Sequence, residues 1–139
     1  MAHRLVVIGG GPAGNQAATT AARLGAEVTL IERDIVGGAA HLLDCIPSKA
    51  MIATGAAMDD LRRAGSMGLT QVDAKLDFEA LRSRIASIEE RLERSVRGLL
   101  ESQGVQLLHG TGRVVGAHQV EVLDADGDAR TLEADTIVL

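Results

Sequence analysis

The residues of this sequence with the clearest chemical potential lie in a glycine-rich stretch near its start. Gly9, Gly11 and Gly14 form the pattern G-x-G-x-x-G within GGGPAG. In this pattern the first glycine permits a tight turn, the second lets backbone approach a pyrophosphate, and the third lets a following helix lie close to a sheet. The free N–H groups and the positive dipole end of that helix then form an anion site at Gly11 to Gly14.

The residues on either side of this loop supply the strand and the helix that the pattern requires. Four apolar residues, Leu5 to Ile8, form a short run typical of a strand buried on both faces. Pro12 suits the first turn of a helix, Ala13 begins a series of alanines that keep the helix thin, and Gly25 is a natural stop. The sequence therefore predicts a strand, a phosphate-binding turn and a helix.

An acidic residue follows at a suitable distance. The apolar run Val28 to Ile31 ends in Glu32, 18 positions after Gly14. This is close to the spacing expected for a carboxylate that binds a ribose hydroxyl. The alternative is that Glu32 only ends a strand in solvent. Together with the glycine loop, the spacing predicts a dinucleotide-binding site.

Cys45 is the only cysteine, and it directly precedes a predicted helix that opens at Pro47. A thiol just ahead of a helix N-terminus has a lowered pKa and favours the thiolate, and Lys49, one turn on, would add to this effect. The alternative is a buried structural cysteine, the commonest fate of a free thiol. Spacing alone does not choose between them.

Three separated motifs together resemble a known family. LVVIGGGPAG, the acid at position 32, Gly37-Gly38 and CIPSK are similar to the FAD-dependent pyridine nucleotide-disulfide oxidoreductases, which include dihydrolipoyl dehydrogenase. The resemblance implies FAD, with its ADP moiety at the glycine loop and Glu32, and with Cys45 and Lys49 as catalytic residues. The cofactor-binding residues that it implies are Gly9, Gly11, Pro12, Ala13, Gly14, Glu32, Arg33, Gly37, Gly38, Ala39, Cys45, Lys49 and Gly112.

The sequence departs from the family at its redox centre. The family's GGTCLNVGCIPSK carries two cysteines that form a disulfide, whereas this sequence reads GGAAHLLDCIPSK, with Ala40 at the first cysteine and Cys45 at the second. Electrons cannot be stored in a disulfide without a second sulfur. The sequence is thus similar to a branch that passes electrons from NAD(P)H through the flavin to a quinone-like acceptor. His41, in the same loop, is either a surface residue or an acceptor-site contact.

Two other functions remain open on the sequence. A second thiol from elsewhere would restore a dihydrolipoyl dehydrogenase or a related disulfide reductase. A non-catalytic FAD- or nucleotide-binding module is the third hypothesis, because no second glycine fingerprint for NAD(P) is present. The family's NAD(P)-binding and dimerisation domains are absent, so residues 1–139 are expected to be an N-terminal FAD-binding fragment, inactive alone and homodimeric when full length.

The remaining chain completes a Rossmann-type α/β fold with a small antiparallel β-meander. A helix is expected over residues 48–63, followed by a loose loop over 65–68. Asp77 is a good N-cap for a second, amphipathic helix that Gly104 ends. We expect this helix to pack against the first one and the sheet, with a membrane or partner role as the alternative. Strands are expected at 105–108, 113–117, 119–123, 130–133 and 135–139, with a hairpin turn at Asp126-Gly127.

Composition excludes several other classes of function. The net charge is -5 and the only aromatic residue is Phe78, so neither a basic patch nor a stacking platform for nucleic acid is expected. The apolar runs are too short to span a bilayer. His109 has no second ligand nearby in the sequence, so no metal site is predicted. A single cysteine fits a reducing cytoplasm.

Overall fold

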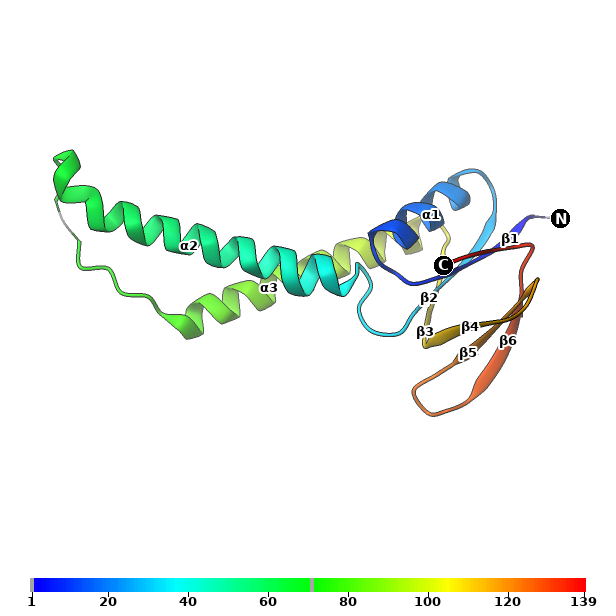
Figure 1. Cartoon of the computed structure of the whole chain (residues 1–139). Helices are drawn as coiled ribbons and strands as arrows, with labels where there is room; N and C mark the ends of the chain where they lie inside the picture. The colour runs from blue at the N-terminus through cyan, green and yellow to red at the C-terminus, as the bar shows by residue number, and fades with distance from the viewer. Residues whose placement is uncertain (1, 71) are drawn as a thin grey trace.

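The computed structural model describes residues 2–70 and 72–139, without the side chains of Ala40 and His41. Its centre is a four-stranded parallel sheet in the order β3-β2-β1-β7 (Figure 1). These strands are β1 (Arg4–Ile8), β2 (Glu27–Glu32), β3 (Gln106–His109) and β7 (Thr136–Val138). The predicted parallel sheet is confirmed, with strand ends shifted by one or two residues.

The β1 run alternates between the two faces of this sheet, and both faces are covered. On one face Val7 packs with Leu30, with Ala18 of α1 (Pro12–Arg23) and with Leu100 of α3 (Phe78–Ser102). All four side chains are fully buried. Burial on both faces explains why Leu5 to Ile8 of β1 form a continuous apolar run rather than an alternating one.

The second face carries the predicted antiparallel meander, which is confirmed. Its strands run in the order β4-β5-β6, and Val120 and Val122 of β5 pack with Ile31 of β2. The strands are β4 (Thr111–Gly116), β5 (Gln119–Leu123) and β6 (Ala129–Glu133). Strand β4 begins at Thr111, two residues before the expected start at residue 113, so Gly112 lies within the strand.

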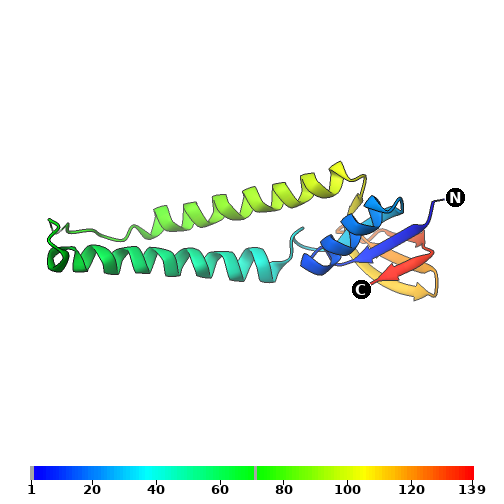
Figure 2. The same ribbon diagram turned by 90° about the horizontal axis from the view of Figure 1, so that it is seen from above.

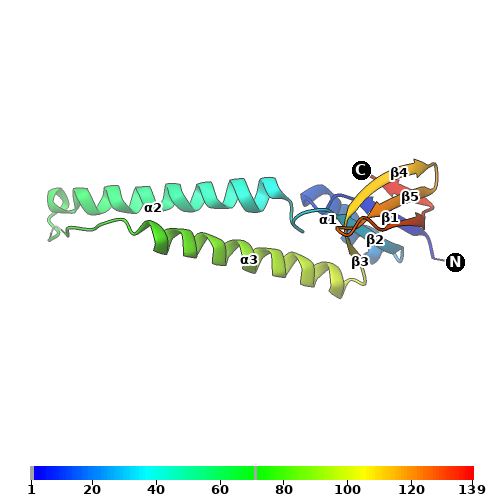
Figure 3. The same ribbon diagram turned by 90° about the horizontal axis from the view of Figure 1, so that it is seen from below.

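Helix α2 (Ile46–Arg63) and most of α3 project from this core as a two-helix arm (Figures 2 and 3). The prediction for α3 is therefore only partly right. It lies beside α2, but only its C-terminal end, around Leu100, reaches the buried core. No residue of α2 is buried, although its stretch from Ala50 to Met58 carries no charge. Hydrophobic periodicity predicted that these two helices form, but it did not show that they extend away from the sheet.

Two short helical segments differ from the sequence expectation. Ala40–Cys45 form a π-helical turn, η1, where a loop was expected, and this turn runs directly into α2. The stretch predicted as a loose loop instead contains a 3₁₀ turn, η2 (Ala64–Met67), closed by Gly68 at φ 78°. The predicted cap of α3 is confirmed, since Asp77 Oδ1 accepts a hydrogen bond of 3.0 Å from the N–H of Ala80. Among the described residues, no helix has the length and apolar character needed to cross a membrane.

Candidate functional site

The candidate site lies at the carboxyl edge of the parallel sheet. The chain runs outward from β1 to β2 and β3 and later returns on the other side of β1 as β7. Strand β1 is thus the point at which the strand order reverses, where open α/β sheets bind their ligands. The turns after β1, β2 and β3 meet here: Gly9 donates an N–H to Ile31 O at 2.8 Å, and Gly110 donates one to Glu32 O at 2.9 Å.

The first turn has a backbone that only glycine fits. Gly9 has φ 106°, a left-handed value that other residues rarely adopt. A side chain on Gly14 would overlap the carbonyl oxygen of Gly9, so only glycine at this position lets α1 lie so close to the turn. Gly11 faces open space, with nothing within 4 Å of a Cβ built on it. It is the N-cap of α1 and makes no side-chain cap, so the helix start is open to an anion.

The second glycine pair closes against the first loop. Gly37 donates its N–H to Gly10 O at 2.8 Å, and a Cβ on Gly38 would lie 2.9 Å from the Cα of Gly11. Both glycines have positive φ. The carbonyl oxygen of Gly38 accepts a hydrogen bond from the N–H of Leu42. This hydrogen bond ties the second glycine pair to the π-helical turn that leads to Cys45. The structure therefore brings Gly37 and Gly38 onto the glycine loop, as expected for two backbone segments that border one ligand.

The carboxylate of Glu32 is held by backbone alone. Its Oε2 accepts the N–H of Gly10 at 2.6 Å, and its Oε1 accepts the N–H of Asp34 at 2.7 Å. Such charge-assisted bonds fix the orientation of the group. A carboxylate has about four acceptor positions, so about two are left for a diol. Glu32 therefore does more than end a strand in solvent: it is oriented beside the turn.

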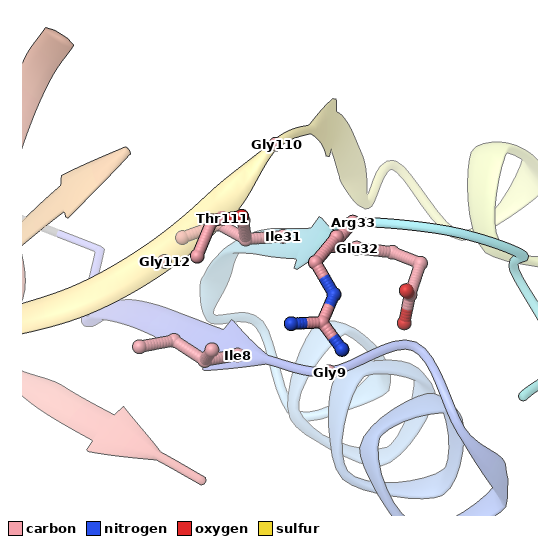
Figure 4. Close-up of a pocket in the computed structure, with 8 residues that line it drawn as sticks. All are labelled: Ile8, Gly9, Ile31, Glu32, Arg33, Gly110, Thr111 and Gly112. Atoms are coloured by element: carbon pink, nitrogen blue, oxygen red, sulfur yellow. The ribbon is translucent and has the colours of Figure 1, made fainter. Parts of the chain in front are cut away.

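A cavity of about 260 Å³ opens between these strand ends (Figure 4). This volume is below the roughly 300–1,000 Å³ usual for a whole small-molecule site, so the cavity would hold only one end of a dinucleotide. The residues that line it are Ile8, Gly9, Ile31, Glu32, Arg33, Gly110, Thr111 and Gly112. The predicted residues Gly9, Glu32, Arg33 and Gly112, which lie far apart in the sequence, thus share one cavity.

Cys45 and Lys49 lie apart from this cavity, at the base of the arm. Cys45 directly precedes α2, but it does not lie at a free helix N-terminus as the sequence predicted, because the π-helical turn η1 runs through it into α2. Its side chain is exposed, which disagrees with the alternative of a buried structural thiol. Lys49, one turn on, is exposed as well. Pro12 and Ala13 lie at the open start of α1, and Ala39 follows the second glycine pair.

Sequence reasoning missed several residues at or beside the site, among them Ile8, Ile31 and Gly110, which line the cavity. Gly10 supplies the N–H that binds Glu32, and a Cβ there would be crowded by Glu32 Cβ at 3.1 Å. The signal was present, because three consecutive glycines exceed what the pattern requires. Thr111 lines the cavity through the early start of β4. Asn15 Oδ1 is buried without a hydrogen-bond partner among the described residues, one turn into α1, and no sequence pattern marked it.

Comparison with known proteins identifies the family of the chain and similar proteins. The family model described as pyridine nucleotide-disulphide oxidoreductase matches residues 3–139. An NAD(P)H dehydrogenase (quinone) from Mycobacterium tuberculosis is 35% identical over 150 residues, covering 100% of this chain and 30% of the relative. A dihydrolipoyl dehydrogenase from Zymomonas mobilis is 33% identical, covering 97% of this chain and 29% of the relative.

A solved structure is similar as well. The crystal structure of LpdA from Mycobacterium tuberculosis superposes with a TM-score of 0.86 at 33% sequence identity. The similarity covers 97% of this chain and 30% of that one. The chain thus spans about a third or less of the length of these similar proteins.

Proposed function

Because the chain belongs to the pyridine nucleotide-disulphide oxidoreductase family, we propose that it is the FAD-binding part of an NAD(P)H-dependent flavoprotein whose acceptor is quinone-like. The observation that carries the proposal is the pair of glycine loops. Gly14 packs on Gly9 and Gly38 packs on Gly11, so two backbone turns meet at the start of α1, where a Cβ built on Gly11 finds nothing within 4 Å. The group that fits at such a helix start is a pyrophosphate.

The residues at the sheet edge fit the ADP moiety of FAD. The N–H groups at Gly11 to Gly14 would bind the pyrophosphate, and the oriented carboxylate of Glu32 would bind the adenosine ribose. The cavity at Gly112 would take the adenine. Gly37, Gly38 and Ala39 lead toward Cys45 and Lys49, which would border the flavin end. When bound, FAD supplies hydride acceptance and electron transfer, and the protein supplies binding and orientation.

The quinone-like acceptor rests on the redox centre. Cys45 is the only cysteine of the sequence, and Ala40 stands where the family has its first redox cysteine. With one sulfur, thiol–disulfide exchange within this chain has no partner. Electrons would therefore leave the reduced flavin directly, with Cys45 and Lys49 tuning its surroundings. The quinone dehydrogenase among the relatives supports this choice.

A dihydrolipoyl dehydrogenase or a related disulfide reductase is the second candidate, because relatives of that name match about as well. Rapid-mixing reduction by NADH of the whole protein that contains this chain separates the two. The quinone proposal expects flavin reduction, quinone turnover and no lipoamide turnover. A long-wavelength thiolate-to-flavin band together with lipoamide turnover would contradict it.

Cofactor binding itself is tested on the 139-residue chain. Free FAD at about 100 times its dissociation constant should stabilise the fold by about 2.7 kcal/mol, or roughly 10 °C in melting temperature. FMN, which lacks the AMP half, is the matched control and should have a much smaller effect. If FAD leaves the melting temperature unchanged, the flavoprotein proposal and its enzymatic reading both fail.

Two further properties belong to the same proposal. The whole protein would be a homodimer, and the exposed apolar residues Met51 and Ile52 of α2 support a covered arm. It would act in the cytoplasm, where a single free cysteine such as Cys45 stays reduced.

A further inference from the structure

Arg33 occupies an unusual place in the cavity beside Glu32. It follows the last residue of β2, and in Figure 4 its side chain runs from that strand end back toward Gly9. The side chain is 70% exposed, and its recorded ion pair is with the neighbouring Asp34, Nε to Oδ2 at 3.3 Å. An exposed pair of this kind contributes little, so it does not fix the guanidinium.

The opposite side of the cavity is flat and largely apolar. Ile8 and Ile31 contribute aliphatic side chains, and Gly112 contributes bare backbone. A Cβ on Gly112 would lie 3.0 Å from Ile8 Cγ2, so the backbone of Gly112 lies tightly against this side chain. The only aromatic residue, Phe78, lies at the start of α3 on the arm. The planar side chain available to this cavity is therefore a guanidinium.

We propose that Arg33 stacks its guanidinium plane on the adenine ring of the bound dinucleotide and holds the base against the wall formed by Ile8 and Gly112. The inference rests on the proposed FAD site and assigns Arg33, already expected to bind the cofactor, to recognition of the base. A guanidinium stacks on aromatic faces through its plane and its charge, whereas the ammonium of lysine keeps the charge but has no plane.

The alternative role for Arg33 is an ion pair with the pyrophosphate. The position of the cavity argues against it. The pyrophosphate is expected at the open start of α1, from Gly11 to Gly14, whereas Arg33 lines the cavity with Gly9 and Gly112. None of Gly11 to Gly14 lines that cavity. The guanidinium is thus placed for the base rather than for the phosphates.

Calorimetric titration of the chain with ADP and with inorganic pyrophosphate separates the two roles. Arg33→Ala should raise the dissociation constant for ADP about 3- to 10-fold, in the range of an exposed cation–π contact, with a change below about 2-fold for pyrophosphate. Arg33→Lys should behave like Arg33→Ala. Arg33→Trp should restore ADP binding to within about 2-fold, because it keeps a plane without the charge. Arg23→Ala, at the exposed far end of α1, removes the same charge and should change neither constant.

Three results would overturn the inference. The first is that Arg33→Ala leaves ADP binding unchanged. Equal weakening of ADP and pyrophosphate, rescued by Lys and not by Trp, would assign Arg33 to the phosphates. A wild-type chain that binds neither ADP nor FAD would remove the dinucleotide site itself, and the inference with it. The first two outcomes leave the proposed FAD site intact, so the two failures are distinguishable.

Discussion

Glycines at the sheet edge and glycines on the arm meet very different surroundings. A Cβ on Gly14 would overlap backbone and one on Gly38 would lie 2.9 Å from the Cα of Gly11, whereas one on Gly55 of α2 meets nothing within 4 Å. At the edge, each missing atom makes room for backbone or for a ligand. On the arm, Met51 and Ile52 remain 56% and 70% exposed. The glycines at the sheet edge thus determine a binding geometry, whereas the residues of the arm determine only that it is helical.

The largest expected effect tests where the arm ends and the core begins. Leu99 and Leu100 are neighbours in α3, but Leu99 is 53% exposed and Leu100 is fully buried. Leu100→Ala should lower the free energy of unfolding by about 2–5 kcal/mol, because it leaves a cavity against Val7 and Leu30. Leu99→Ala and Ile52→Ala should stay within about 0.5 kcal/mol, as surface changes do. Urea unfolding measures all three.

If Ile52→Ala lowered the free energy of unfolding as much as Leu100→Ala does, the contrast between the arm and the core would be wrong. It would mean that the outer face of α2 is buried in solution, since exposed side chains have little transfer free energy to lose. The concentration dependence of unfolding would then identify a second copy of the chain as the cover, because association makes stability depend on concentration.

The same substitution at two glycines sharpens the contrast. Gly14→Ala should destabilise the fold by roughly 1–3 kcal/mol through overpacking against Gly9 and should weaken FAD binding. Gly55→Ala, in the exposed interior of α2, should stabilise by about 0.5–1 kcal/mol because alanine is the better helix former. Thermal unfolding with and without FAD checks both. If Gly14→Ala bound FAD normally, α1 would not lie as close to the turn as the structure has it.

The sheet edge and the arm also differ in how far the sequence predicts their structure. The strand, turn and helix from Leu5 to Gly25 follow from local patterns, because burial on two faces and positive φ leave direct marks on residue types. The approach of Gly38 to Gly11 does not, since it depends on how the second loop folds back. The π-helical turn before Cys45 has no known sequence mark here. The projection of α2 escaped prediction because an apolar helix is expected to be buried.

Acidic residues show this difference once more. At the parallel sheet, two carboxylates bind backbone: Glu32 binds Gly10, and Asp135, just before β7, accepts the N–H of Arg4 at 2.8 Å. On the arm, Asp59 and Asp60 both bind the side chain of Arg63, although Asp77 caps the backbone at the start of α3. Backbone donors persist when side chains change, so the contact of Asp135 should tolerate a substitution that removes the arginine.

Asp135 gives the smallest and most selective test of this idea. The pKa of Asp135 is lowered, first by the backbone N–H of Arg4 and then by the Arg4 side chain. A lowered folded-state pKa contributes stability above the unfolded value of 3.8, and this stability is lost as the pH falls through the folded-state pKa. Asp135→Asn should therefore flatten the fall in stability below about pH 4, measured by urea unfolding across acid pH. Arg4→Met should keep most of that fall, because the backbone donor remains; if it flattens the curve as much as Asp135→Asn does, the side chain dominates and the contact between β1 and β7 resembles those of the arm.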